Sequence, residues 1–167
     1  HLLPIIIPIE SINFFGGLMA KIQWQTVFET KVPSIDMQHK RLVAMINQLE
    51  DAIATGKGVV NEEIGSVLVQ LVEYTQYHFS EEENIQREIG FSEAVRHAEY
   101  HRMFVEQIKE TLIRLREGGS INVYELMNFL RDWLLNHILT EDRKIGIEYA
   151  QRNARHTSPL VASSAKG

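Results

Sequence analysis

The stretch HFSEEENIQREIGFSEAVRHAEYH, residues 78–101, carries the pattern that decides the fold of this chain. It combines three histidines and six glutamates with regularly spaced apolar residues. His78 and Glu82 are four residues apart, and so are His97 and His101, so in a helix each pair shares one face about a turn apart. The stretch therefore predicts two helices whose polar pairs are either surface groups or metal ligands.

The same helical period extends outward from this stretch in both directions. Apolar residues recur every three or four positions between about 34 and 152, and the runs are separated by the breaks TGKGVVN, EIGFS and REGGSIN. No run alternates with period two for long enough to predict a strand. The sequence therefore predicts an all-α, up-down-up-down antiparallel four-helix bundle with short connections, preceded by a non-helical N-terminal extension.

The chain divides into three parts by composition. We interpret residues 1–21 as an N-terminal extension, either upstream sequence or non-native, 22–152 as the bundle domain, and 153–167 as a flexible tail or linker. The opening HLLPIIIPIESINFFGGL is apolar, but its prolines, its charge and its glycine pair make it too short and too broken to span a membrane. It also lacks the basic start of a signal peptide, so we expect a cytoplasmic protein.

The bulk composition excludes several classes of site. The chain has no cysteine, which excludes disulfides, thiolate metal sites and iron–sulfur clusters, so any metal must be held by His, Asp and Glu. The net charge is −5, and Lys and Arg are scattered. Without a basic stripe we expect neither a nucleic-acid partner nor a membrane partner.

Histidine and glutamate occupy inward positions where a bundle ordinarily carries apolar residues. The inward polar positions on the four helical stripes are His39, His78, Glu82, His97, His101 and His137. A lone inward histidine is more often a core residue bonded to a carbonyl than a metal ligand. Five together, with a carboxylate that is costly to bury alone, favour metal binding. In an up-down bundle these positions also meet at one end.

One further acid joins this set with an unusual spacing. Asp142 follows His137 by five residues, which do not share a face in a regular helix. We therefore expect either a local widening of the helix or an Asp side chain that wraps around to the metal. The acids off the inward stripe are predicted to form a solvated face: Glu81, Glu83, Glu88, Glu93 and Glu99.

Five imidazoles and two carboxylates are too many donors for one ion. Two metals bridged by Glu82 and Asp142 would use the full set, and one of them would keep an open position for a small ligand. Nitrogen-rich, thiolate-free ligation suits iron better than calcium or magnesium, and zinc or manganese stays open as an alternative.

Four segments together resemble the hemerythrin family, and more closely its bacterial branch. They are PSIDMQHKRL (33–42), YTQYHFSEEE (74–83), HAEYH (97–101) and DWLLNHILTED (132–142), and the resemblance covers about residues 22–150. The resemblance implies two iron ions with a bridging oxo or hydroxo group, and O2 as the ligand. It implies that one iron is held by His97, His101 and His137, that the open iron is held by His39 and His78, and that Glu82 and Asp142 bridge the two.

The leading function hypothesis is reversible O2 binding for storage, delivery or sensing. In the sensing variant this chain is a domain of a larger signalling protein, with an output domain or partner. The alternative is a di-iron enzyme acting on peroxide, nitric oxide or ferrous iron. Histidines outnumber carboxylates and the Glu-x-x-His motif of di-iron oxidases is absent, which favours binding over catalysis. A metal-free structural bundle is the third alternative, and it would leave buried polar groups without partners.

Three residues are candidates for a ligand pocket: Ile35, Trp133 and Gln86. Trp133 lies one turn before His137, where a pocket wall and an ordinary core residue are equally expected. The bacterial branch commonly has Met at the position of Gln86, and we expect this glutamine to face solvent. A core-facing glutamine would add a polar group near the metals.

Overall fold

The computed structural model describes residues 21–55 and 62–157, together with the backbone of 14–15 and 18–19. Most of the predicted extension and the end of the predicted tail lie outside these residues. The longer elements are helices α1 (Pro33–Thr55), α2 (Glu62–Ile89), α3 (Ala94–Arg116), α4 (Val123–His137) and α5 (Arg143–Thr157), with the π-helix η2 (Ile138–Asp142) between the last two. The 3₁₀-helix η1 (Thr26–Phe28) and the antiparallel strands β1 (Phe14–Phe15) and β2 (Leu18–Met19) precede them.

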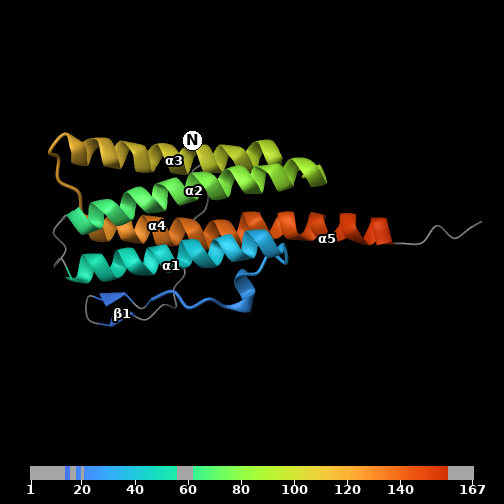
Figure 1. Cartoon of the computed structure of the whole chain (residues 1–167), viewed down its shortest axis with the longest axis horizontal. Helices are drawn as coiled ribbons and strands as arrows, with labels where there is room; N and C mark the ends of the chain where they lie inside the picture. The colour runs from blue at the N-terminus through green and yellow to red at the C-terminus, as the bar shows by residue number, and fades with distance from the viewer. Residues whose placement is uncertain (1–13, 16–17, 20, 56–61, 158–167) are drawn as a thin grey trace, which may run out of the picture.

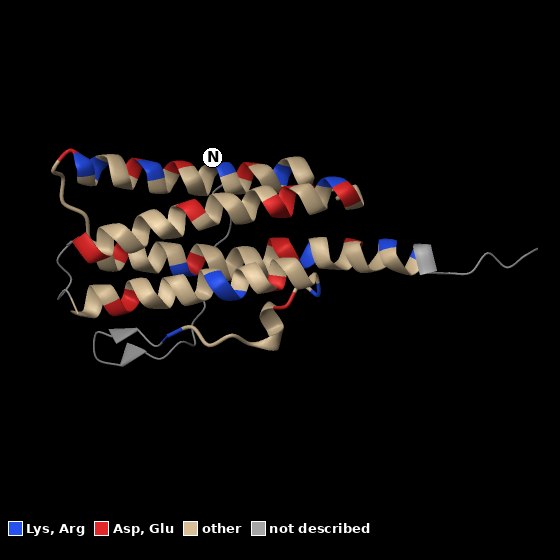
Figure 2. Ribbon diagram, viewed as in Figure 1, with Lys and Arg blue, Asp and Glu red and all other residues tan. Residues whose placement is uncertain are grey.

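The helices form an up-down-up-down bundle, which confirms the predicted fold (Figure 1). Helices α4, η2 and α5 follow one another along one line and together make the fourth arm. As a result the start of α1, the end of α2, the start of α3 and the end of α4 lie at the same end of the bundle. Acidic and basic residues are interspersed along α3, whereas nearly all the charged residues of α2 are acidic (Figure 2).

Local sequence signals explain where the helices begin and end. Pro33 occupies the first position of α1, where its missing N–H costs nothing. Asn122 caps α4 by accepting hydrogen bonds from the backbone N–H groups of Tyr124, at 3.1 Å, and Glu125, at 3.3 Å. At the end of α2, Gly90 has φ +68°, and the following N–H donates back to the Gln86 carbonyl at 2.8 Å. This glycine turn lets α3 run back along α2.

The apolar core has two parts of unequal size. The larger cluster fills the length of the bundle from Ile53 and Ile64 to Phe79 and Leu134. The smaller cluster, Val32, Ile35, Phe91 and Ile145, closes the end of the bundle and is called the apolar cap below. The predicted polar layer lies at this same end of the bundle.

The segment before α1 packs along the bundle. The backbone of Ile22 exchanges two 2.9 Å hydrogen bonds with the Asn47 side chain. Trp24 and Phe28 meet edge to face at 5.7 Å and pack on the larger cluster. Asp36 then accepts hydrogen bonds from the backbone and hydroxyl of Thr30 at 2.7 and 2.8 Å. These contacts bring the segment to the end of the bundle that carries the polar layer.

The C-terminal arm is longer than the sequence analysis predicted. Helix α5 continues to Thr157, so the first residues of the predicted tail 153–167 are helical. In Figure 1 this helix extends past the ends of the other helices.

The Gly146→Ala substitution should destabilise the fold, because Gly146 touches the backbone of the segment before α1. A Cβ atom added at Gly146 would lie 1.8 Å from the carbonyl oxygen of Thr30. Overpacking against rigid backbone costs about 1–3 kcal/mol, so the free energy of unfolding should fall by about that amount in urea denaturation.

Gly65→Ala is the matched control for this measurement. Gly65 lies in α2, and its added Cβ would meet nothing within 4 Å among the described residues. This change should stabilise the protein by roughly 0.5–1 kcal/mol through helix propensity. Equal effects of the two substitutions would contradict the contact at Gly146.

Candidate metal centre

All seven residues predicted as metal ligands meet in one buried layer. His39 comes from α1, His78 and Glu82 from α2, His97 and His101 from α3, His137 from α4 and Asp142 from η2. None of these side chains is more than 6% exposed. Such a set of buried polar groups is stable only if its members are paired with one another or coordinate a cation.

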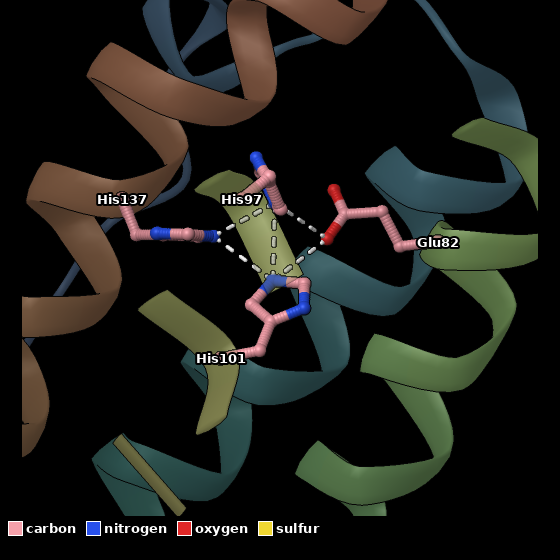
Figure 3. A group of neighbouring side chains, drawn as sticks. All are labelled: Glu82, His97, His101 and His137. Carbon is pink, nitrogen blue, oxygen red and sulfur yellow. Dashed lines mark hydrogen bonds and ion pairs between the residues drawn. The ribbon is translucent and has the colours of Figure 1, made fainter. Parts of the chain in front are cut away.

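Three imidazole nitrogens form an equilateral triangle in this layer (Figure 3). The Nε2 atoms of His97, His101 and His137 are each 3.1 Å from the other two. Nitrogens on one face of an octahedral ion lie about 3 Å apart when each metal–nitrogen bond is about 2.1 Å. The triangle therefore has the dimensions of a tridentate face for one ion, and Glu82 Oε2 lies 3.1 Å from the His101 nitrogen.

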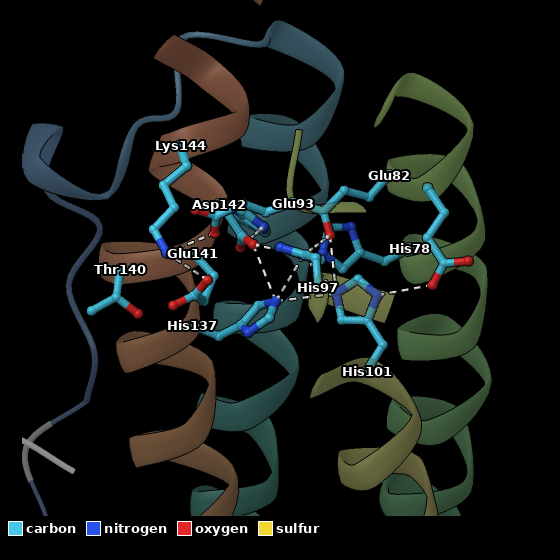
Figure 4. A network of polar contacts seen from close by, with 12 residues as sticks. His78, Glu82, Glu93, His97, His101, His137, Thr140, Glu141, Asp142 and Lys144 are labelled. Carbon is cyan, nitrogen blue, oxygen red and sulfur yellow. Dashed lines mark hydrogen bonds and ion pairs between the residues drawn. The ribbon is translucent and has the colours of Figure 1, made fainter. Parts of the chain in front are cut away.

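A second group of donors adjoins the triangle. One ligand atom each from His39, His78 and Glu82 lie within 4.8 Å of one another. Asp142 directs its two oxygens to different groups: Oδ1 lies 3.1 Å from the His137 Nε2, and Oδ2 lies 3.1 Å from the His39 Nε2. Glu82 belongs to both donor groups. Both carboxylates are thus placed between the two groups (Figure 4).

The unusual spacing of His137 and Asp142 is resolved by the backbone. Residues Ile138–Asp142 form a π-helix, which confirms the first of the two predicted alternatives, a local widening of the helix. A π-helix accommodates one extra residue per turn without breaking the helix, and such turns are frequent at functional sites. The wider turn brings the side chains of both residues into the same layer.

Two outer hydrogen bonds orient the imidazole rings. His78 Nδ1 lies 2.8 Å from Gln38 Oε1, and His101 Nδ1 lies 3.1 Å from Glu83 Oε1. Each ring can donate outward through Nδ1–H, so that Nε2 faces the donor groups, as is usual for metal-binding histidines. Burial opposes the charging of His101, but its hydrogen bonds with Glu82 and Glu83 outweigh burial and raise its pKa to about 9.

Burial and neighbouring charges set the protonation of the other donors. Burial lowers the pKa of His78 to about 3, so this ring is neutral at pH 7. Burial and the charge of Asp142 raise the pKa of Glu82, but hydrogen bonds from the α3 histidines outweigh them and lower it to about 2. Burial raises the pKa of Asp142, but the interactions with His137 and His39 outweigh burial and hold this pKa well below its usual value. Neutral imidazoles and ionised carboxylates are the forms that bind metals, so His101, whose pKa is raised, would release its proton when a metal binds.

Aromatic rings line the side of the layer that faces the bundle interior. Phe79 stacks on His101 with ring centroids 3.6 Å apart, and Trp133 stacks on His137 at 4.3 Å. Below them lies a cavity of about 10 Å³ whose wall includes Phe79, Trp133 and Leu134. Trp133 is therefore both a core residue and part of a cavity wall. Ile35 lies in the apolar cap.

The sequence matches a known family over most of this region. Residues 30–146 match the family described as Hemerythrin, hemerythrin HHE cation binding domain. The chain belongs to the hemerythrin family. It is 36% identical over 149 residues to a bacteriohemerythrin of Pseudomonas aeruginosa, covering 89% of this chain and 92% of that protein.

Further relatives agree with this assignment. The chain is 33% identical to a bacteriohemerythrin of Methylococcus capsulatus, with 77% of this chain and 96% of that protein covered. A solved structure described as wild-type hemerythrin superposes with a TM-score of 0.70 at 32% identity, covering 77% of this chain and 97% of that one. None of the described helices is long and apolar enough to cross a membrane.

Two predictions about polar residues of α2 were wrong. Gln86 was expected to face solvent, but it is 1% exposed and lies in the core. Glu83 was expected on the solvated face, but it is half-buried and bonded to His101. Of the other acids of the predicted face, Glu88 and Glu99 are exposed, whereas Glu81 and Glu93 are half-buried, and Glu93 accepts a 3.2 Å hydrogen bond from Lys144 (Figure 4).

The sequence analysis also overlooked Gln38. It lies three residues after Ile35 and four before Leu42, which places it on the inward face of α1. The helical spacing was sufficient to find it. Its role as the partner of His78 depended on the packing of α1 against α2, which the spacing does not show.

The Glu83→Gln substitution should weaken metal binding without removing a predicted ligand. A neutral amide orients and polarises the His101 ring less than a carboxylate does, and loss of such an outer partner typically costs about 10–100-fold in metal affinity. Calorimetric titration of the metal-stripped protein with Zn²⁺ measures the change. Glu88→Gln, on the exposed side of the same helix, should leave the affinity unchanged. Equal Zn²⁺ affinities for the two variants would show that Glu83 does not support metal binding through His101.

Proposed function

We propose that the seven buried residues hold two iron ions and that the protein binds O2 reversibly. The observation that carries the proposal is the division of the donors into a nitrogen triangle and a second group, with Glu82 and Asp142 between them. His97, His101 and His137 would hold one ion, and His39 and His78 the other. The two carboxylates would bridge them, with an oxo or hydroxo group as a further bridge.

The chemistry of the donors favours iron. Imidazole and carboxylate without thiolate suit ferrous and ferric iron and disfavour calcium and magnesium, which prefer oxygen ligands alone. When bound, the two ions would supply electrons to O2 and recover them on release. The ion held by His39 and His78 would have only these two imidazole nitrogens as ligands. A position for a small ligand would therefore stay open on this ion.

The surrounding residues suit a small apolar ligand. The cavity below Phe79, Trp133 and Leu134 has an apolar wall and room for about one water-sized molecule. The apolar cap at the other side of the layer limits access of water from the end of the bundle. A water-poor site disfavours the escape of charged products and the entry of protons, and both conditions favour reversible binding.

The enzyme alternative has less support from the described residues. Both groups of three or more potential metal-binding side chains within the described ranges belong to this single centre. The centre carries five histidines and two carboxylates, whereas di-iron oxidases use carboxylate-rich sites. We therefore favour O2 storage, delivery or sensing in the cytoplasm over turnover of peroxide, nitric oxide or ferrous iron. Sensing would further require an output domain or partner. The length of the natural gene product tests whether an output domain is present.

The optical spectrum of the iron-loaded protein during deoxygenation and re-oxygenation tests the proposal. We expect charge-transfer bands that appear with O2 and vanish when O2 is removed, over repeated cycles. His137→Ala should reduce the iron content from two to one per chain and abolish the reversible bands, while Glu88→Gln should retain both. Irreversible oxidation with consumption of peroxide would favour the enzyme alternative instead.

A further inference from the structure

Gln86 is a buried amide whose polar atoms lack partners. The side chain is 1% exposed, and neither Nε2 nor Oε1 has a hydrogen-bond partner among the described residues. Leaving a buried amide without partners costs about 1–3 kcal/mol. An apolar side chain of the same size would avoid this cost. Gln86 therefore destabilises the metal-free fold. A hydrogen-bond partner that the amide gains when metal binds would offset this cost.

The position of Gln86 places it between the metal centre and the apolar cap. It follows Glu82 by one helical turn and His78 by two, on the inward face of α2. The next residues lead to the cap, since the Phe91 N–H donates to the Gln86 carbonyl at 2.8 Å and Phe91 is a cap residue. Along α2, Gln86 therefore lies between the turn that carries Glu82 and the glycine turn that leads to the cap, and its side chain is buried.

Glu82 offers the acceptor that Gln86 lacks. Its Oε2 lies 3.3 Å from the His97 Nε2 and 3.1 Å from the His101 Nε2, whereas no described group bonds its Oε1. Long side chains in a helix lean toward the N-terminus, over the residue four positions earlier. For Gln86 that residue is Glu82. A carboxylate oxygen has more than one lone pair, so it can bind a metal and accept a hydrogen bond together.

We propose that the Gln86 amide donates a hydrogen bond to Glu82 and positions this carboxylate between the two ions. The role rests on the metal centre proposed above and adds a positioning residue to it. The hydrogen bond would hold the orientation of the bridge. It would also withdraw electron density from the carboxylate, which stabilises the lower charge of the ferrous ions and raises the reduction potential of the pair.

Gln86→Met tests the proposal, because Met has a similar size and no donor. In the metal-stripped protein the midpoint of thermal unfolding should rise, since an unpartnered amide is removed. Titration with Zn²⁺ should nevertheless show about tenfold weaker binding, the loss expected when an outer partner of a ligand is removed. In the iron-loaded protein the reduction potential should shift to a lower value.

Ile85→Met is the matched control, because Ile85 packs against the cap from the same helix turn and carries no polar atom. It should leave Zn²⁺ affinity and reduction potential unchanged. If Gln86→Met binds Zn²⁺ as the parent protein does and keeps its potential, Gln86 is only a packing defect and the proposal is wrong. Failure of reversible O2 binding in the parent protein would overturn the proposed function alone, since Zn²⁺ affinity and potential are measured without O2.

Discussion

The structure depends on the burial of seven polar side chains in one layer at the end of a four-helix bundle. Five imidazoles and two carboxylates lose their water there, and they can recover the lost interactions only from one another or from bound cations. The alternating direction of the helices makes the layer possible, because it brings the start of α1 and α3 to the ends of α2 and α4. The larger apolar cluster, which fills the rest of the bundle, supplies the stability that such a layer does not.

The π-helix shows how closely the backbone is adapted to this layer. In a regular α-helix a residue five positions after another is rotated by about 140° from it, which would direct Asp142 away from His137. The wider turn at Ile138–Asp142 brings the two side chains together while α4 and α5 stay in line. The segment before α1 then packs on the start of α5, where Gly146 leaves room for the Thr30 carbonyl. The irregular backbone is thus enclosed by its neighbours.

Much of the fold and of the donor set could be predicted from the sequence. The period of apolar residues predicts the four helices, and the positions of His39, His78, His97 and His137 within them predict that they converge. These predictions depend only on the geometry of a regular helix and on the alternating direction of successive helices, and both follow from the sequence pattern. The spacing of five residues before Asp142 predicts either a local widening or a side chain that wraps around, and the structure contains the widening.

Other features depended on packing that one helix alone does not specify. Gln86 was expected to face solvent but is 1% exposed, while the adjacent Ile85 is half-buried and packs against the apolar cap. Glu83 has the composition of a surface residue, yet α3 lies close enough for His101 to bond it. The period of apolar residues identifies the buried face of a helix to within about one residue. At the edge of that face, the packing of the neighbouring helix decides whether a side chain is buried.

Anomalous X-ray diffraction at the iron absorption edge, from crystals of the iron-loaded protein, tests the central claim most directly. The account predicts two peaks roughly 3–4 Å apart, a separation typical of two-metal sites. One peak should lie within the triangle of His97, His101 and His137, the other beside His39 and His78, with Glu82 and Asp142 between them. A single peak, or iron bound outside this layer, would contradict it.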